Sequence, residues 1–269
     1  MFGKMMQNQS IDRSNGARVL AWSEQRGWRE EERLLAGEIP LTLYLDRVEL
    51  ATILCTPEKL NYLVVGFLRS EQLIERLDDI ALLRVCEEEG VADVRLTRPR
   101  EVVGRRILTS GCGGGVTFDE GRSLSAVSSD LTVSPGQVLP CMTALLQSEG
   151  GRGESGGLHL AALSDGETLL VTSRDVGRHN TLDKIQGECL FRGIRTEGRM
   201  LLTTGRISSE MLVKVARMGV PITVSLNSPT DRAVQLAERL GITVIGHARG
   251  SRLSVYSNPE RLRGSYRPA

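Results

Sequence analysis

The apolar residues of this chain follow two spacings, and each spacing predicts a different kind of element. Alternation of apolar and polar residues predicts half-buried β-strands, and apolar residues three or four positions apart predict helices with one buried face. Residues 40–54 alternate on both sides of Asp46-Arg47, which predicts a β-hairpin. Residues 56–74 carry the longer spacing and open with Thr56-Pro57, a helix-start signal.

Two further strands, at 81–88 and 92–98, are expected in this first region. Polar segments precede it. Residues 1–18 have no periodicity and predict a loose tail, and the charge-rich residues 24–34 predict a solvated segment. We therefore interpret residues 19–105 as a small N-terminal α+β domain and residues 106–269 as a second domain.

The second domain shows the pattern of an α/β fold. A helix is expected over 137–149, a flexible glycine-rich link over 150–157 and a hairpin over 158–173 around Asp165-Gly166. Strands and helices then alternate: the expected strands are 169–173, 200–204, 221–226 and 242–246, and the expected helices are 181–193, 210–219 and 231–241. This alternation predicts βαβ units and a largely parallel sheet.

Composition and charge exclude several kinds of partner. The chain has 269 residues, of which 40% are hydrophobic and 25% charged, and its formal net charge is +1. Neither nucleic acid nor a membrane is therefore an expected partner. No apolar run reaches the roughly 18–20 residues of a membrane span, and the N-terminus lacks the apolar stretch of a signal peptide. We expect a cytoplasmic protein.

The cysteines are five in number and lie far apart, at positions 55, 86, 112, 141 and 189. Their odd number argues against a disulfide framework, and no pair has the CxxC spacing of a zinc site, so no metal is expected. Four of them have apolar neighbours and are expected in the core. Cys112 lies among four glycines, where its thiol is expected to be uncovered and available as a reversible carrier of a persulfide, an acyl group or a redox state.

Candidate binding residues come from the segments that follow the predicted strands, because open α/β sheets bind ligands outside the carboxyl ends of their strands. Arginine forks and helix N-termini in these segments favour a multiply anionic ligand such as a nucleotide. Any one arginine is more often an ordinary surface residue, but a cluster at one edge favours a site. The candidates are Asp175, Arg178, His179, Arg206, Ser208, His247, Arg249, Gly250, Ser251 and Arg252.

The three histidines lack a metal-binding spacing such as HExxH. A lone histidine is more often a structural hydrogen-bonding residue. His179 in DVGRHN and His247 in HARGSR are nevertheless expected to line the site, because each follows a predicted strand. For His159 the structural and functional interpretations stay equally open.

Four motifs resemble those of the FdhD-type formate dehydrogenase accessory sulfurtransferases. They are GCGGG at 111–115, DVGRHNTLDKIQG at 175–187, TTGRISSEMLVK at 203–214 and HARGSRLSVY at 247–256. The segment PLTLYLDRVELATILCTPEKLNYLVVGFLRSE at 40–71 looks like that family as well. The resemblance therefore covers about residues 39 to 257.

The resemblance implies both a fold and a function. The fold is a cytidine-deaminase-like α/β/α sandwich with a smaller N-terminal α+β domain. Such proteins take persulfide sulfur from a cysteine desulfurase and pass it to a molybdenum cofactor with two pterin guanine dinucleotides, which then enters formate dehydrogenase. A guanine nucleotide such as GDP is the expected surrogate for that cofactor, and a homodimer is common in the family.

The resemblance also assigns site residues. Cys112 matches the persulfide-carrying cysteine, and the segment of His247, Ala248, Arg249, Gly250, Ser251 and Arg252 matches the cofactor-binding segment. Two positions depart from the family pattern: Gly115 stands where many members have a second cysteine, and His247 stands where phenylalanine is usual. The deaminase zinc signature is absent, because Pro140-Cys141 has no second cysteine three residues on.

Two other functions stay open at this point. Because Gly115 removes a second loop thiol, the chain could be a non-catalytic chaperone that binds the molybdenum cofactor, with Cys112 dispensable. A weaker alternative is a nucleotide-modifying hydrolase on a deaminase-like fold, for which bound zinc would be the sign.

Overall fold

The predicted N-terminal sheet is present in the computed structural model, which describes residues 15–98, 108–109, 124–148 and 157–264. Its strands pair in the order β5-β6-β3-β4-β7; they are β3 (Ile39–Leu45), β4 (Val48–Cys55), β5 (Ile80–Cys86), β6 (Val91–Leu96) and β7 (Leu108–Thr109). The β3–β4 hairpin is confirmed. Its turn residues Asp46 and Arg47 have φ of 49° and 73°, which suit a tight turn between twisted strands.

Helix α1 (Leu60–Ser70) begins later than predicted. Thr56-Pro57 does not start it, because Thr56 is held by the second half of the chain. The amide of Thr56 donates to Oδ2 of Asp175 (3.1 Å), and its hydroxyl accepts from the amide of Val176 (3.1 Å). The 3-10 helix η1 (Leu77–Asp79) then leads into β5, and α1 and the sheet enclose an apolar core of their own.

The second sheet has six strands in the order β13-β12-β11-β10-β8-β9. They are β8 (His159–Ser164), β9 (Leu169–Asp175), β10 (Met200–Thr203), β11 (Ile222–Ser225), β12 (Thr243–Arg249) and β13 (Arg252–Ser257). Strands β10, β11 and β12 are parallel, as the βαβ pattern predicts.

The prediction of a largely parallel sheet is wrong, because two hairpins make the sheet mixed. The confirmed hairpin around Asp165-Gly166 places β8 between β9 and β10, antiparallel to both. The segment after Gly246 was expected to be a loop. It continues β12 instead and turns back as the antiparallel strand β13.

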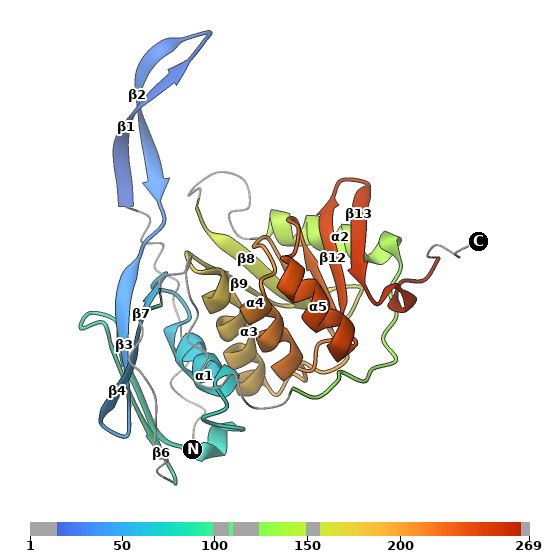
Figure 1. Ribbon diagram of the computed structural model, residues 1–269. Helices are drawn as coiled ribbons and strands as arrows, with labels where there is room; N and C mark the ends of the chain where they lie inside the picture. Colours follow the sequence, from blue (N-terminus) through green and yellow to red (C-terminus); the bar gives the residue numbers. More distant parts are fainter. Residues whose placement is uncertain (1–14, 99–107, 110–123, 149–156, 265–269) are drawn as a thin grey trace.

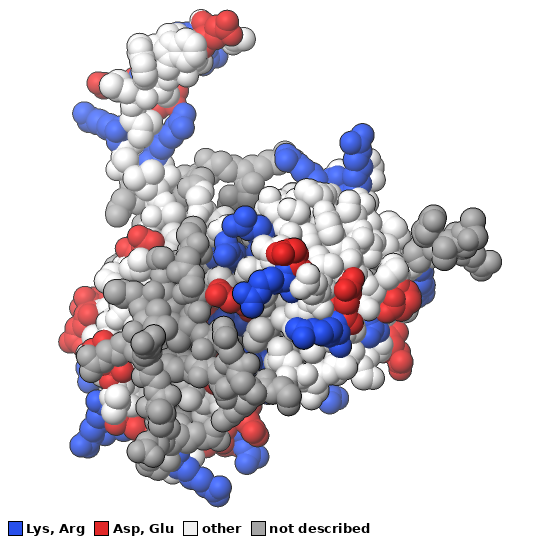
Figure 2. Space-filling model, viewed as in Figure 1, with Lys and Arg blue, Asp and Glu red and all other residues white. Residues whose placement is uncertain are grey.

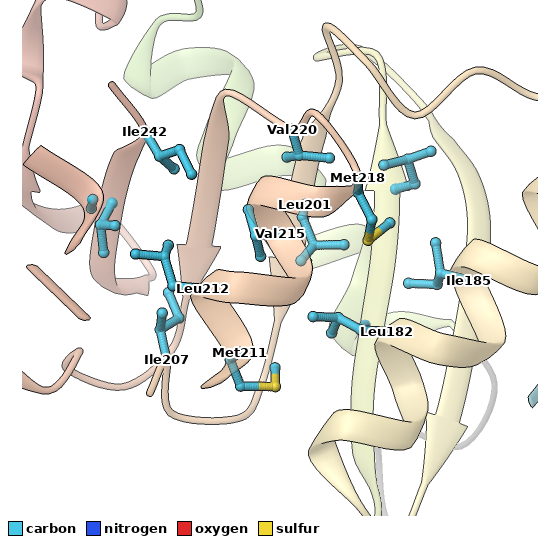
Figure 3. Close-up of a cluster of buried hydrophobic side chains, with 14 of the residues drawn as sticks. Leu182, Ile185, Leu201, Ile207, Met211, Leu212, Val215, Met218, Val220 and Ile242 are labelled. Atoms are coloured by element: carbon cyan, nitrogen blue, oxygen red, sulfur yellow. The ribbon is translucent and has the colours of Figure 1, made fainter. Parts of the chain in front are cut away.

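Helices cover both faces of this sheet and give three layers (Figure 1). Helix α2 (Pro135–Gln147) packs on one face through Val138, Met142 and Leu145. Helices α3 (Arg178–Arg192), α4 (Ser209–Arg217) and α5 (Asp231–Leu240) cover the other, and η2 (Pro259–Arg261) follows β13. Figure 3 shows side chains of α3 and α4 meeting between the helices and the sheet. The three layers agree with an α/β fold, and the cytidine-deaminase-like topology stays a prediction.

Helices α1 and α3 cross at two glycines and so join the two sheets (Figure 1). A Cβ on Gly66 would lie 1.7 Å from the carbonyl oxygen of Asp183, and a Cβ on Gly187 would lie 1.9 Å from that of Tyr62. Only hydrogen at these positions lets the two backbones approach so closely. The predicted domain boundary at 105/106 lies outside the described residues, although the apolar cores on its two sides are separate.

The two most N-terminal strands form a ribbon that extends away from the rest of the molecule (Figure 1). Strands β1 (Asn15–Ser23) and β2 (Gly27–Leu35) pair only with each other among the described strands. Residues 15–18 were expected in a loose tail and instead open β1; the rest of that predicted tail lies outside the described residues. Within the described part of the chain, we find no helix with both the length and the apolar character that crossing a membrane requires.

Candidate functional site

The carboxyl ends of four strands and the start of a fifth line one edge of the six-stranded sheet. Strands β10, β11 and β12 are parallel and end at this edge. Because β8 is antiparallel to both neighbours, β9 also ends there, and His159 at the start of β8 lies opposite Asp175 at the end of β9. The edge predicted from the sequence is therefore present, and it includes His159.

Hydrogen bonds between the post-strand segments hold this edge together. The side-chain amide of Asn227 after β11 donates to the carbonyl of Thr204 (2.8 Å), and the hydroxyl of Ser225 donates to that of Gly205 (2.8 Å). At β12, a Cβ on Gly246 would lie 2.8 Å from the carbonyl oxygen of Asn227. The segment after β11 thus contacts both the segment after β10 and strand β12 itself.

Asp175 lies behind the edge, with no exposed surface. Its Oδ1 accepts from the amide of Gly177 and the side-chain amide of Asn180 (both 2.8 Å). Its Oδ2 accepts from the amide of Thr56 (3.1 Å) and is 2.6 Å from Nζ of Lys184, which is equally buried. The predicted cofactor-binding carboxylate therefore has all its partners inside the protein and positions the turn before α3.

Arg178, His159 and Gly205 lie side by side where the edge is formed by β9, β8 and β10. A Cβ on Gly205 would be 3.0 Å from Cβ of Arg178 and 3.4 Å from Nδ1 of His159. Nε of Arg178 is buried and has no hydrogen-bond partner among the described residues. Burial, and next the positive charge of Arg178, lower the pKa of His159, while Asp175 opposes the shift. His159 is therefore neutral at neutral pH.

His179 is buried one residue further along α3 and is also neutral. Burial lowers the pKa of His179 to about 3, and the positive charges of Lys214 and Arg178 add to the shift. Nε2 of His179 is 3.4 Å from Oε2 of Glu210, a contact that would favour protonation, but burial and the two cations outweigh it. Of these predicted site residues, Arg178 therefore carries a positive charge, and the imidazole rings of His159 and His179 are neutral.

Arg206 and Ser208 lie where β10 leads into α4. The Arg206 side chain is exposed, as a ligand-binding residue there requires. Ser208 is the N-cap of α4, and its hydroxyl accepts from the amide of Met211 (3.4 Å). The Ser208 hydroxyl therefore serves as the acceptor for a backbone amide at the N-terminus of α4 that has no partner within the helix.

The predicted cofactor segment His247–Arg252 forms the end of β12, the turn and the start of β13. His247 adopts a left-handed backbone (φ 52°), its side chain is exposed, and its ring lies 6.3 Å from that of Tyr256 between centroids. Ala248 points the other way and is fully buried in the core under α2. Arg249 and Arg252 pair across the hairpin and are exposed, as are Gly250 (φ 62°) and Ser251.

Positive side chains therefore gather along one rim. In the view of Figure 2, Lys and Arg side chains are prominent at the turn of the β12–β13 hairpin. Arg178, Arg206, Arg249 and Arg252 have no ion-pair partner among the residues that the structure describes. The rim can accept an anionic ligand without breaking an ion pair between described residues.

Cys112 and the GCGGG motif lie outside the described residues. Of the other cysteines, Cys55, Cys141 and Cys189 are buried in the cores as expected, whereas Cys86 at the end of β5 is half-buried. Between the gaps of the description, no group of three or more His, Cys, Asp and Glu side chains could hold a metal ion.

The sequence interpretation missed the residues that support the edge from behind. Lys184 donates to the carbonyls of Thr56 (3.2 Å) and Arg174 (3.1 Å) in addition to its contact with Asp175. Asp183 accepts from Lys214 (2.6 Å) and from Ser70 (2.6 Å). Asp183 and Lys184 lie inside DVGRHNTLDKIQG, so the length of that motif was the available signal.

Comparisons with known proteins agree with this architecture. The sulfur carrier protein FdhD of Bacillus subtilis (strain 168) is 38% identical over 251 residues, covering 90% of this chain and 95% of that protein. The protein of the same name from Staphylococcus haemolyticus (strain JCSC1435) is 39% identical over 235 residues, 85% and 89% of the two chains. The crystal structure of a protein described as a formate dehydrogenase accessory protein from Desulfotalea psychrophila superposes with a TM-score of 0.74 at 26% identity, over 93% of this chain and 99% of that one. The family model of the FdhD/NarQ family matches residues 36–263, and the chain therefore belongs to the FdhD/NarQ family.

Proposed function

We propose that this chain is a sulfur carrier in which Cys112 takes persulfide sulfur from a cysteine desulfurase. It passes that sulfur to the molybdenum bis(pterin guanine dinucleotide) cofactor of formate dehydrogenase. The observation that carries the proposal is the match over 90% of the chain to a relative named sulfur carrier protein. The name of the similar solved structure supports formate dehydrogenase as the enzyme that is served.

The proposed carrier step needs a single thiolate. The Cys112 thiolate attacks the terminal sulfur of the desulfurase persulfide, a new S–S bond forms on Cys112, and the desulfurase thiolate leaves. The terminal sulfur then passes to the cofactor at the oxidation level of sulfide. This transfer reduces the terminal sulfur by two electrons. Two thiols other than Cys112 supply these electrons and become one disulfide, and Cys112 returns to its thiol. Cys55 and Cys189 do not suit this role, because burial raises the pKa of each to about 12.

The rim of the six-stranded sheet supports an anionic cargo. Arg178, Arg206, Arg249 and Arg252 lack ion-pair partners within the described ranges, and guanidinium groups bind phosphate through two parallel hydrogen bonds. The neutral rings of His159 and His179 flank Arg178 without adding charge that would have to be neutralised. In this proposal the rim holds the pyrophosphate and guanine parts of the cofactor, for which GDP is a surrogate.

The test follows sulfur on individual cysteines. We expect that incubation with a cysteine desulfurase and cysteine adds one sulfur atom to Cys112, detected by peptide mass spectrometry without reductant. Cys112→Ala should lose that sulfur and fail to support formate dehydrogenase activity in cells that lack their own copy. Cys86→Ala is the matched control, because Cys86 is a half-buried cysteine that does not belong to the motif and should change neither result.

The cofactor chaperone without sulfur chemistry is the alternative, and Gly115 in place of a second loop cysteine favours it. If Cys112 never gains sulfur, or if Cys112→Ala supports full formate dehydrogenase activity while GDP binding persists, this alternative replaces the carrier.

A further inference from the structure

The chain that leads to Cys112 leaves the described residues at the end of β7. Strand β7 runs parallel to β4 and places Thr109 beside Ile53, so the chain at Thr109 runs toward the C-terminal end of β4. Cys112 follows Thr109 by three residues, and three residues of chain span at most about 11 Å. Any group that contacts the Cys112 sulfur therefore lies near this end of β4.

The start of α3 is bound to the same end of β4. The side-chain amide of Asn180 donates to the carbonyl of Leu54 (2.8 Å), the residue that follows Ile53. Asn180 lies in the first turn of α3, which Arg178 and His179 open. The first turn of α3 is therefore among the groups that lie near the end of β4.

This helix start has features of an anion site. The N-cap Gly177 supplies no side-chain cap to α3, and the first turn contains no acidic residue. Nε of Arg178 and Nε2 of His179 are buried, and neither makes a hydrogen bond to a described residue, although His179 is only 8% exposed. A helix N-terminus attracts negative charge, and buried polar atoms without a partner point to a bound group.

Arg178 supplies the net charge of this site, because the groups around it are neutral or paired. His159 and His179 are neutral at neutral pH. The charged groups that pack around them are the ion pairs Asp175–Lys184 and Asp183–Lys214, together with Glu210 at 3.4 Å from His179. A single guanidinium beside two neutral rings suits a singly charged anion better than a pyrophosphate.

Position along the sheet separates Arg178 from the arginines of the β12–β13 hairpin. Arg178 and His159 both lie against Gly205, whereas Arg249 and Arg252 pair across the hairpin. Strand β8, which carries His159, is three strands away from β12, and neighbouring strands are about 4.8 Å apart, so about 14 Å separates the two strands. The edge therefore offers two separate places for negative charge.

We propose that the start of α3 binds the sulfur anion on Cys112, with Arg178 as the catalytic residue that contacts this sulfur. The inference rests on the proposed function, in which Cys112 carries the sulfur. The guanidinium favours loss of the thiol proton to water, and the thiolate attacks the desulfurase persulfide. The terminal sulfur moves to Cys112, and the desulfurase thiolate leaves with the electron pair of the broken S–S bond. The same cation then stabilises the anionic form of the Cys112 persulfide.

The experiment measures alkylation of Cys112 by iodoacetamide against pH in the full chain. Trypsin releases Cys112 in residues 107–122 and Cys86 in residues 85–95, and each is the sole cysteine of its peptide, so mass spectrometry follows them separately. We expect the pH midpoint for Cys112 to lie at least about one unit below the 8.5 of an ordinary cysteine, before any desulfurase or nucleotide is added.

Two substitutions separate the charge of Arg178 from its shape. Arg178→Gln should raise the Cys112 midpoint by about one pH unit, and Arg178→Lys, which keeps the charge, should retain most of the lowering. Arg239→Gln removes an exposed arginine in the last turn of α5 and should leave the midpoint unchanged. The Cys86 midpoint should be the same in every variant, and urea unfolding shows whether Arg178→Gln is folded.

Two results would overturn the inference. The first is an ordinary midpoint for Cys112 in the unmodified chain, a result that depends on no variant. The second is a midpoint that Arg178→Gln leaves unchanged, or that Arg239→Gln shifts equally. In either case, sulfur gained by Cys112 from a desulfurase would still support the proposed carrier. A low midpoint that depends on Arg178, in a chain whose Cys112 never gains sulfur, would support this site and contradict the carrier.

Discussion

At the residue scale, the buried His179 predicts a pH dependence of stability. Its pKa is lowered to about 3 by burial and by the charges of Lys214 and Arg178, from an ordinary value of 6.5. Between these values the unfolded chain binds a proton that the folded chain does not, so the free energy of unfolding falls as the pH falls. We expect His179→Gln to remove about 3 kcal/mol of that loss between pH 7 and pH 4, measured by urea unfolding with circular dichroism.

The control for this prediction is His247→Gln, because the His247 side chain is exposed. Its unfolding should follow pH as the unmodified chain does. If His179→Gln shows the same pH profile as the unmodified chain, His179 is not the neutral buried group described above.

Asp175 and Ala248 show that a sequence motif does not reveal the direction in which each of its side chains points. Both belong to segments that the sequence correctly identified, but Asp175 turns inward to Thr56, which lies 119 positions earlier in the chain. Ala248 points into the core because β12 continues through the cofactor segment and its side chains alternate. Side-chain direction depends on these distant partners, which no local pattern contains.

At the element scale, the β12–β13 hairpin predicts a change in ligand affinity. If the exposed pair Arg249 and Arg252 holds phosphate as proposed, Arg249→Ala and Arg252→Ala should each weaken GDP binding about tenfold, or about 1.4 kcal/mol. Titration calorimetry measures this. Arg239→Ala is the control, because Arg239 is an exposed arginine in the last turn of α5 rather than on the rim. Equal weakening by Arg239→Ala would mean that net charge, and not the hairpin, determines affinity.

The elements themselves were largely predictable where local signals are strong. Helix α5 ends at Gly241 with φ of 66°, as its glycine signal indicates, and the β3–β4 and β8–β9 hairpins form at their turn residues. Strand β13 was missed because the bend of β12 at His247 breaks the alternation. The ribbon of β1 and β2 was missed because the charges of β2 obscure its strand pattern, and β2 buries almost nothing.

At the scale of the whole molecule, the crossing of α1 and α3 predicts that both sheets unfold together. Gly66→Ala and Gly187→Ala each place a methyl group against a backbone carbonyl, which forces the helices apart. We expect each to lower the free energy of unfolding by at least about 2 kcal/mol in chemical denaturation, with one transition retained. Gly136→Ala in α2 is the control, because the nearest atom to its added methyl is 3.7 Å away. Two separate transitions, or substitutions as mild as Gly136→Ala, would contradict this role.

The division into two halves was predictable, because the pattern of strands and helices along the chain changes between them. The hydrogen bonds and ion pairs between the two halves were not predictable. Arg174 of β9 binds Glu58 through two hydrogen bonds (2.8 and 2.7 Å), and Lys59 binds Glu188 of α3 (2.7 Å). In the sequence these residues are ordinary charges near helix ends. Their pairing follows from the helix crossing, which brings positions more than a hundred residues apart into contact.

The crossing of α1 and α3 also determines when, during synthesis on the ribosome, the first half of the chain can complete its packing. Gly66 leaves the ribosome about 120 residues before Gly187, and at about 5–20 residues per second the wait lasts roughly 6–24 s. Closing so long a loop costs roughly 4 kcal/mol of chain entropy, which the later contacts must offset. During that interval the face of α1 that will meet α3 is bare, and the nascent chain is a natural client for chaperones. The first half of this protein therefore reaches its final packing only when synthesis is well into the second.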